Sequence, residues 1–270
     1  MTATKSLELQ QIGEGLAGRD TRAEGETVLW LHGYTLDSSS FEEAWSFLPR
    51  FRHVGLDLPG HGGSARMTPG TTLRDLASRV VDVATREGAL HLVALSFGTI
   101  VGLEVAMRHA KAFRTVTLAA PAIAGGPSDP EMARAYQRMS MLYRMAGRIP
   151  ELVRMWLASP AWRGVETREG LRERLAEIVG RHGFEELLDR SRMSMFTGPP
   201  QSEVEIAGID ARLLILLGSN EMPAFKTCAA TIERCVPRAK REELPGVEHL
   251  CILQAPEACA RLIEAHLLAG

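Results

Sequence analysis

The chain has 270 residues, of which 45% are hydrophobic and 24% charged, which is typical of a soluble globular protein with one large α/β domain and an insertion. The formal net charge of −2 provides no basic field for nucleic acid or for an anionic lipid surface, so neither is expected as a partner. No apolar run approaches the roughly 20 residues that span a bilayer, and residues 1–6 lack the apolar segment of a signal peptide, so we predict a cytoplasmic protein without a membrane partner.

Strand and helix patterns alternate along the first half of the chain. Short apolar runs predict buried strands, and apolar residues at helical spacing predict helices that pack on a sheet. The predicted elements are a strand within 5–13, a polar turn region at 13–26, a strand at 28–31, a helix from about 38 to 48, a strand at 53–56, a loop at 57–64, a helix at 72–87, a strand at 91–95, a helix that begins after Ser96 and ends near 112, and a strand at 115–118. This alternation favours a parallel sheet with helices on both faces.

The alternation stops after Pro121. Residues 125–200 show helical spacing only, with candidate helices that include 171–180 and 184–195, and they contain seven of the eleven methionines. Strands and helices then return, with a strand at 212–218, a helix at 223–235, a strand at 241–244, a loop at 245–249 and a closing helix at 256–268. We therefore predict an α/β core formed by 1–121 and 206–270, with a helical lid inserted at 122–205.

The four cysteines all lie in the last fifth of the chain, at Cys228, Cys235, Cys251 and Cys259. The spacings of seven and eight within the two pairs match one face of a helix and not a C-x-x-C metal site. Small buried thiols are therefore expected. The sequence contains no P-loop, dinucleotide fingerprint or cluster of metal-ligating residues, so we expect no cofactor and no metal.

One serine lies where an apolar strand changes into a helix. The local sequence is Ala94-Leu95-Ser96-Phe97-Gly98, with small residues two places before and two places after Ser96. A sharp strand-to-helix turn needs small residues at those places and holds its serine clear of the backbone. Alone, A-x-S-x-G is a weak signal, and Ser96 could equally be an ordinary buried serine.

Four further motifs accompany this serine in a characteristic order. They are His32-Gly33-Tyr34, Asp57-Leu58-Pro59-Gly60-His61-Gly62, Gly218-Ser219-Asn220-Glu221 and Gly246-Val247-Glu248-His249. Together with the turn at Ser96, they resemble the α/β-hydrolase superfamily over essentially the whole chain, although the lid matches by position only. The resemblance implies a mostly parallel eight-stranded sheet flanked by helices, with an inserted all-helical lid. It also implies a catalytic order of serine, acid and histidine.

The resemblance implies a role for each candidate site residue. Ser96 would be the nucleophile and His249 its base, because a serine hydroxyl needs a base to become nucleophilic. The acid would be Glu221, at a position where the family usually has aspartate; Asp129 is the alternative. The backbone N–H groups of Tyr34 and Phe97 would form the oxyanion hole. The other seven histidines are expected to be structural.

The lid is expected to contribute aromatic and methionine side chains above Ser96. Methionine adapts to irregular apolar ligands, and aromatic rings add large flat contacts. We therefore expect a hydrophobic small molecule to contact Tyr34, Met139, Tyr143, Met155, Trp156 and Met195. Further candidates for the same face are Tyr136, Met141, Met145, Trp162 and Met193. Equally, these residues could only fill the core between the lid helices.

These features predict a serine hydrolase that cleaves an ester, thioester or lactone of a hydrophobic small molecule through an acyl-Ser96 intermediate. A serine at the turn excludes dehalogenases and epoxide hydrolases of this fold, which use an aspartate there. Two alternatives stay open at this point: a lyase or cyclase that uses the same triad, and a ligand-binding protein on a hydrolase scaffold. The sequence leaves the substrate and the oligomeric state open.

Overall fold

The structure, a computed structural model, describes residues 7–66, 68–188 and 198–269. The strands within these ranges form one eight-stranded sheet with the order β1-β2-β4-β3-β5-β6-β7-β8. They are β1 Gln10–Gly13, β2 Leu16–Asp20, β3 Thr27–Leu31, β4 Arg52–Leu56, β5 Ala89–Leu95, β6 Thr115–Ala119, β7 Arg212–Gly218 and β8 Lys240–Leu244. β3 to β8 run parallel, whereas β2 is antiparallel to β1 and β4. The predicted eight-stranded, mostly parallel sheet is confirmed.

The central strands are buried on both faces, which explains their continuous apolar sequences. All five residues of β3 are buried, and so are all five of β6. In β5, Ala94 lies between Leu31 of β3 and Leu118 of β6. Ser96 therefore follows the carboxyl end of a strand at the middle of the sheet, where parallel sheets place their ligand sites.

The prediction for residues 13–26 was wrong, because β2 lies within the expected turn region. Its sequence Leu-Ala-Gly-Arg-Asp has little strand propensity of its own. The strand is specified by its partners: Gly18 pairs with Leu56, and a Cβ on Gly18 would lie 2.0 Å from the carbonyl oxygen of Gly55. Only glycine allows this close contact, so tertiary pairing outweighs local sequence here.

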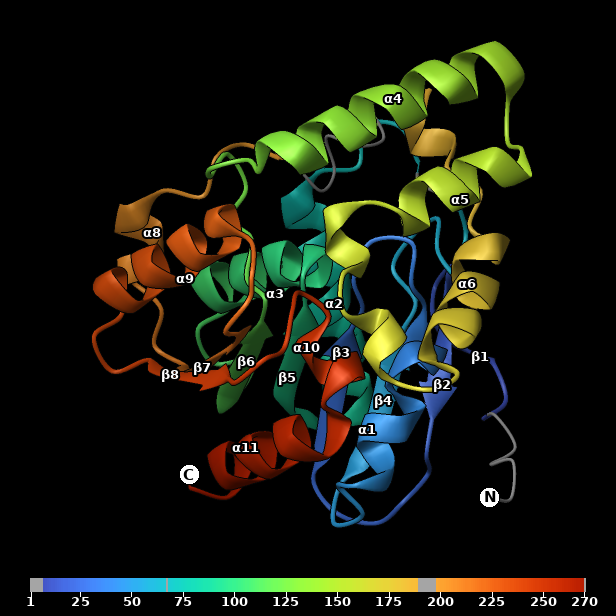
Figure 1. Ribbon diagram of the computed structural model, residues 1–270. Coiled ribbons are helices and arrows are strands. Elements are labelled where there is room, and N and C mark those ends of the chain that lie inside the picture. The colour runs from blue at the N-terminus through green and yellow to red at the C-terminus, as the bar shows by residue number, and fades with distance from the viewer. Residues whose placement is uncertain (1–6, 67, 189–197, 270) are drawn as a thin grey trace.

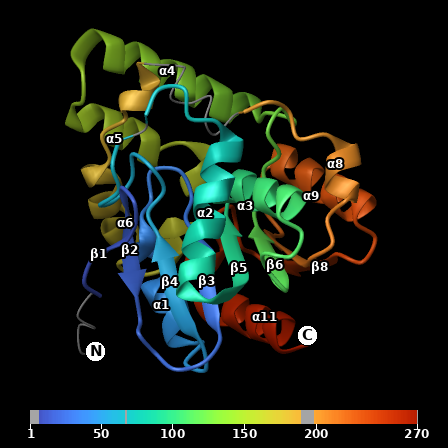
Figure 2. The ribbon, with the colours of Figure 1, turned by 180° about the vertical axis from the view of Figure 1, so that it is seen from behind.

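Helices cover both faces of the sheet, as predicted. Helices α2 (Leu73–Glu87) and α3 (Phe97–Arg108) lie on one face, and α1 (Glu42–Ser46) and α11 (Pro256–Leu268) lie on the other (Figures 1 and 2). The ends of α2 match the prediction because Thr72 and Asp75 form a capping box and Gly88 ends the helix in the left-handed conformation.

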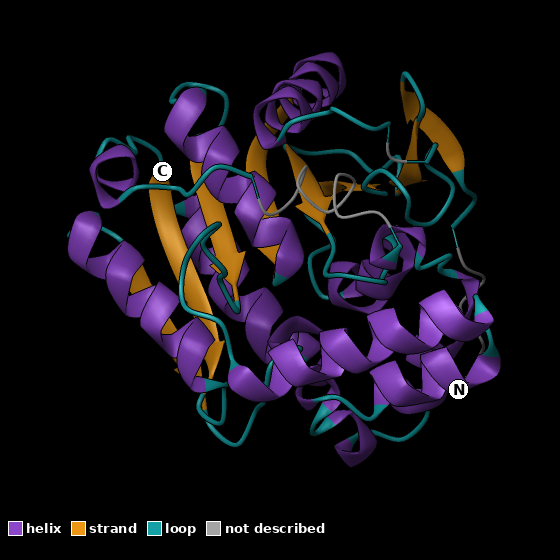
Figure 3. Cartoon of the chain, turned by 90° about the horizontal axis from the view of Figure 1, so that it is seen from above, coloured by secondary structure: helices purple, strands orange, loops and turns teal. Residues whose placement is uncertain are grey.

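The remaining core helices are short or lie near the last strands. They are η1 Ser38–Phe41, α8 Glu203–Ala207, α9 Pro223–Cys235 and α10 Cys251–Gln254. Figure 3 shows the strands in orange with helices in purple on both sides. Within the described ranges, no helix has both the length and the apolar character that crossing a membrane requires.

In the described residues between β6 and β7, the regular elements are all helices, and the long helix crosses above the sheet (Figure 1). The first of these elements are α4 Pro130–Ala146, α5 Pro150–Leu157, η2 Pro160–Trp162, η3 Val165–Thr167, α6 Leu171–Arg181 and η4 Glu185–Leu187. The helix predicted at 184–195 is, in its described part, only the short turn η4, while 189–197 lie outside the described residues.

Candidate active site

Ser96 connects β5 to α3 in a strained backbone conformation, with φ 50° and ψ −117°. Such a conformation is rare outside glycine and needs support from its surroundings. A Cβ on Gly98 would lie 2.6 Å from the carbonyl oxygens of Leu31 and His32, so the first turn of α3 is pressed against the end of β3. On the other side of the serine, Ala94 faces Gly102, whose missing side chain leaves room for the alanine methyl group.

This packing predicts a clear difference between two single-methyl changes. We expect Gly98→Ala to lower the free energy of unfolding by about 1 to 3 kcal/mol, because the new methyl group displaces backbone. We also expect it to lower kcat/KM by about 10²-fold by moving Ser96. Urea unfolding and ester hydrolysis measure the two effects.

Ala94→Gly is the matched control, since it removes a methyl group from the other side of Ser96. Its expected cost is about 0.5 to 1 kcal/mol, from the greater backbone freedom of glycine. Equal destabilisation by the two changes would contradict the proposed close contact at Gly98.

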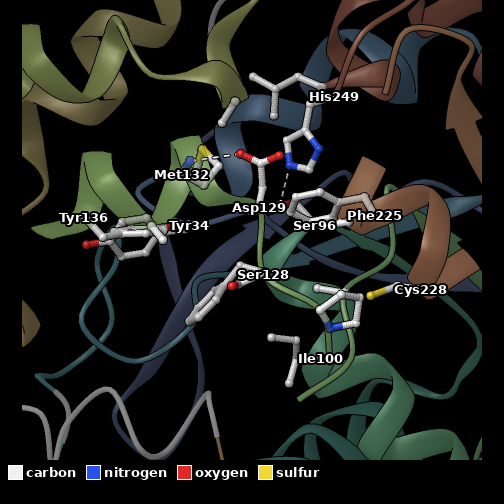
Figure 4. Close-up of a pocket in the computed structure, with 18 of the residues that line it drawn as sticks. Tyr34, Ser96, Ile100, Ser128, Asp129, Met132, Tyr136, Phe225, Cys228 and His249 are labelled. Atoms are coloured by element: carbon white, nitrogen blue, oxygen red, sulfur yellow. Dashed lines mark hydrogen bonds between the residues drawn. The ribbon is translucent and has the colours of Figure 1, made fainter. Parts of the chain in front are cut away.

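His249 lies between Ser96 and Glu221. Its Nε2 is 2.7 Å from Ser96 Oγ (Figure 4). Its Nδ1 is 2.9 Å from both carboxylate oxygens of Glu221. The side chains of His249 and Glu221 are 4% and 0% exposed, so water does not compete for their contact. The structure thus aligns the three residues that the sequence singles out.

The loops that carry the acid and the histidine are fastened to each other. A Cβ on Gly218 would lie 2.1 Å from the carbonyl oxygen of Val247, and Asn220 N donates to that same oxygen at 3.0 Å. The backbone N–H of Met222 donates to Glu221 Oε1 at 2.7 Å. These contacts fix the longer glutamate side chain at hydrogen-bond distance from His249.

Asp129, the alternative acid, has a different set of partners. Its Oδ1 accepts the backbone N–H groups of Glu131 and Met132, both at 3.0 Å, and so caps the first turn of α4. In the described part of the chain, Glu221 is the only residue that accepts a hydrogen bond from His249 Nδ1. The geometry therefore favours Glu221 over Asp129 as the acid.

The turn at His32-Gly33-Tyr34 packs directly against the serine. A Cβ on Gly33 would lie 3.5 Å from Ser96 Cβ, and the rings of Tyr34 and Phe97 have centroids 5.7 Å apart. His32 shapes this turn: its Nε2 accepts the N–H of Leu58 at 2.9 Å, and its Nδ1 lies 2.8 Å from the carbonyl oxygen of Gly33. Burial lowers the pKa of His32, consistent with a neutral ring that holds backbone.

The Tyr34 hydroxyl points away from Ser96 into a buried polar cluster. It donates to Glu186 Oε1, which also lies 3.0 Å from His182 Nε2. Burial and the nearby carboxylate raise the pKa of Tyr34 well above its ordinary value, so the phenol stays a donor. Burial acts to raise the pKa of Glu186, but the hydrogen bonds from His182 and Tyr34 lower it overall.

Sequence reasoning missed this cluster. Glu186 was not among the candidate site residues, and His182 was expected only to be one of the structural histidines. The only signal was their spacing of four residues, which places them within reach of each other but says nothing of burial. Because Glu186 lies in the segment between β6 and β7, the cluster joins that segment to the turn at Tyr34.

A cavity of about 360 Å³ opens beside Ser96 and His249. Most of its lining is apolar or aromatic. The core contributes Gly33, Tyr34, Leu36, Phe97, Ile100, Ala122, Ile123, Ala224, Phe225, Cys228 and Leu250, and the segment above contributes Pro127, Ser128, Asp129, Met132, Ala133, Tyr136, Trp156, Ala161 and Trp162. Cys228 is a buried thiol that lines the cavity, and Cys251 and Cys259 are buried in the core. Cys235 is only partly buried, so the expectation of small buried thiols holds for three of the four cysteines.

The structure corrects the expected lining. Tyr34 and Trp156 line the cavity, but Met139, Tyr143 and Met155 do not, and Met195 lies outside the described residues with Met193. Met139 and Tyr143 follow Met132 and Tyr136 on the same face of α4, yet only the first half of this face lies over the cavity. Helix α4 also packs on α5 and η4, and Ser140 in its second half donates to the carbonyl oxygen of Leu187 in η4.

Two further methionines of α4 point outwards. Met141 is 66% exposed and Met145 is 80% exposed, so neither forms part of a roof over Ser96. Helical periodicity locates a buried face, but it cannot say whether a cavity or a neighbouring helix lies under each turn of that face.

Known proteins resemble this chain in both sequence and fold. The sequence pattern of the alpha/beta hydrolase family matches residues 28–262. A pimeloyl-(acyl-carrier protein) methyl ester esterase from Methylococcus capsulatus is 31% identical over 169 residues, which cover 60% of this chain and 63%, less than two thirds, of that protein. MenH from S. aureus has a TM-score of 0.79 at 16% identity, with 94% of this chain and 97% of that chain covered. An enol-lactonase from Burkholderia xenovorans LB400 has a TM-score of 0.78 at 17% identity, with 96% and 99% covered. The chain therefore belongs to the alpha/beta hydrolase family, with that family's fold.

Proposed function

We propose that the protein hydrolyses a carboxylic ester, thioester or lactone of a hydrophobic small molecule through an acyl-Ser96 intermediate. The observation that carries the proposal is the alignment of Ser96, His249 and Glu221 beside an apolar cavity. Membership of the alpha/beta hydrolase family and the likeness to a methyl ester esterase support ester chemistry.

In the first step, Ser96 Oγ attacks the substrate carbonyl carbon while His249 Nε2 accepts the hydroxyl proton. The distance of 2.7 Å between these atoms allows direct transfer. The imidazolium that forms is stabilised by the Glu221 carboxylate at Nδ1, which also fixes the tautomer that leaves Nε2 free to accept.

Negative charge then develops on the former carbonyl oxygen. The backbone N–H groups of Tyr34 and Phe97 are the proposed donors to this oxygen, since Phe97 follows Ser96 at the start of α3 and the turn before Tyr34 packs against Ser96. When the tetrahedral intermediate collapses, the bond to the leaving alcohol or thiol breaks, and that group takes the proton from His249. Water then attacks the acyl-Ser96 ester, with His249 as base, and releases the acid and free Ser96.

A fluorophosphonate probe tests the nucleophile. We expect the folded protein to bind the probe covalently at Ser96 and to hydrolyse p-nitrophenyl acyl esters. A folded protein that fails to react at Ser96 would contradict the proposal. Reaction with the probe but no turnover of simple esters would favour the lyase or cyclase alternative.

The apolar cavity predicts a preference for longer acyl groups. Each buried methylene contributes about 0.8 kcal/mol, so we expect kcat/KM to rise about 10- to 10²-fold from acetyl to hexanoyl p-nitrophenyl esters. Met132→Ala should reduce this rise because Met132 lines the cavity. Met141→Ala, an exposed methionine of the same helix, is the matched control and should leave the rise unchanged. Equal kcat/KM values for the p-nitrophenyl esters from acetyl to octanoyl would contradict binding of the acyl group in this cavity.

A further inference from the structure

The charges around the cavity are unevenly distributed. Among the described residues that line it, none is lysine or arginine, and the one acid is Asp129. His249 is engaged with Ser96 and with a second carboxylate, Glu221. Among the described lining residues, an anionic substrate group would therefore find no lysine or arginine to pair with and would face a like charge.

One oxygen of the Asp129 carboxylate is available to a ligand. Oδ1 accepts two backbone N–H groups at the start of α4, but Oδ2 makes no hydrogen bond or ion pair with the described residues. The side chain is half-buried and points into the cavity in Figure 4. The helix N-terminus carries a partial positive charge that offsets only part of the carboxylate charge.

Aromatic rings form one wall of the same cavity. The ring centroids of Tyr34 and Tyr136 are 5.7 Å apart, and the Trp156 ring lies 5.3 Å from each of them. Trp162 adds a further ring 5.9 Å from Trp156. Because the Tyr34 hydroxyl donates to the Glu186 carboxylate, electron density is pushed into its ring. Electron-rich faces attract cations, and several such rings together bind alkylated ammonium groups.

We propose that the substrate carries an alkylated ammonium group, which Asp129 and the aromatic wall bind while Ser96 attacks the ester. This inference rests on the proposed ester hydrolysis and adds the substrate class. An alkylated ammonium suits the site better than a primary amine. A primary ammonium has three N–H donors to satisfy, and apart from Asp129, Ser96 and His249 the described lining residues offer it only the side-chain hydroxyls of Ser128, Tyr34 and Tyr136 as oxygen acceptors. Alkyl groups, in contrast, are compatible with the apolar lining.

Esters that differ in one terminal group test the proposal. The acyl series consists of p-nitrophenyl esters with three methylenes between the carbonyl and a trimethylammonium, a tert-butyl or a carboxylate group. The alcohol pair consists of choline hexanoate and 3,3-dimethylbutyl hexanoate. Trimethylammonium and tert-butyl have nearly the same shape, so their ratio of kcat/KM reports charge recognition.

The ammonium group can enter the cavity on the acyl or on the alcohol side of the ester. For the side that enters, we expect kcat/KM of the trimethylammonium ester to exceed that of its tert-butyl counterpart by about tenfold, as is typical of aromatic and carboxylate contacts with a partly desolvated cation. The carboxylate ester should be the poorest of the acyl series. Asp129→Asn should bring the trimethylammonium to tert-butyl ratio close to one. Asparagine also caps helices well, so α4 keeps its first turn.

Glu131→Gln is the matched control. It removes the same charge two residues away, from an exposed side chain that is paired with Arg163 and does not line the cavity. We expect this variant to keep the wild-type ratio. The proposal would be overturned if the trimethylammonium to tert-butyl ratio of kcat/KM were near one in the wild type for both the acyl series and the alcohol pair. It would also be overturned if Asp129→Asn left that ratio unchanged.

Binding to a Ser96→Ala protein separates this inference from the proposed hydrolysis. Tryptophan fluorescence follows choline hexanoate as it binds, and Asp129→Asn in the same background should weaken that binding about tenfold. If no ester is hydrolysed but this difference in binding holds, the hydrolase proposal fails and the ammonium site stands. If esters are hydrolysed without any charge preference, the ammonium site fails and the hydrolase proposal stands.

Discussion

Replacing Ser96 by alanine is expected to lower kcat/KM for p-nitrophenyl hexanoate by about 10⁴- to 10⁶-fold, the range typical for loss of a serine nucleophile. The reason is that Ser96 Oγ is the hydroxyl held 2.7 Å from the His249 base, so its removal ends acyl-enzyme formation. Residual activity should come from the cavity and the backbone donors alone. Steady-state kinetics and loss of fluorophosphonate reaction measure the effect.

The matched control is Ser78→Ala, an exposed serine of α2 whose hydroxyl donates to the carbonyl oxygen of Arg74. It should behave like the wild type in both assays. Thermal unfolding of the Ser96→Ala protein checks that the fold persists, since alanine in the same strained turn carries no new atoms. Activity within tenfold of the wild type would remove Ser96 from the mechanism.

Replacing Glu221 by glutamine is expected to lower kcat by about 10²- to 10⁴-fold with the fold retained, as for the acids of comparable triads. Glu221 Oε1 accepts the N–H of Met222 at 2.7 Å, so the amide oxygen of glutamine takes this place. The amide NH2 group then faces His249 Nδ1, where Oε2 stands at 2.9 Å. The neutral amide stabilises the imidazolium less than the carboxylate does, and its NH2 group competes for Nδ1 and favours the tautomer with the ring proton on Nε2, which cannot take the proton of Ser96.

Two further variants sharpen this test. Glu221→Asp keeps the charge but shortens the side chain by one methylene, so we expect a smaller decrease in kcat than with Glu221→Gln. Glu248→Gln is the control, because it makes the same change in the residue before His249, whose side chain makes no hydrogen bond to the imidazole in the described part of the chain. A wild-type rate for Glu221→Gln would exclude Glu221. A large loss with Asp129→Asn on all esters, neutral ones included, would then favour Asp129 as the acid.

The sequence by itself determined the parts of the fold in which local and global preferences agree. Continuous apolar runs placed β3, β6 and β7 to within a residue or two, because strands buried on both faces must be apolar throughout. Apolar residues at helical spacing placed α2 to within a residue, and the helix predicted at 223–235 matches α9, which begins at Pro223. The order of motifs along the chain identified Ser96, Glu221 and His249, and the assignment of their catalytic roles remains a prediction, as does the boundary of the lid at 122 and 205.

Only the tertiary structure decided which groups meet. Strand β2 forms because β4 offers a partner edge and Gly18 has room for no side chain, neither of which its own sequence reveals. The buried face of α4 was predictable, but Met132 lines the cavity whereas Met139 is buried outside its lining. Glu186 joins Tyr34 across 152 residues of chain, and Asp129 faces the cavity with one oxygen while it caps α4 with the other. A sequence pattern reports the periodicity of one helix or strand. A site forms where several elements meet, so the charge and the shape of the cavity depend on how those elements pack.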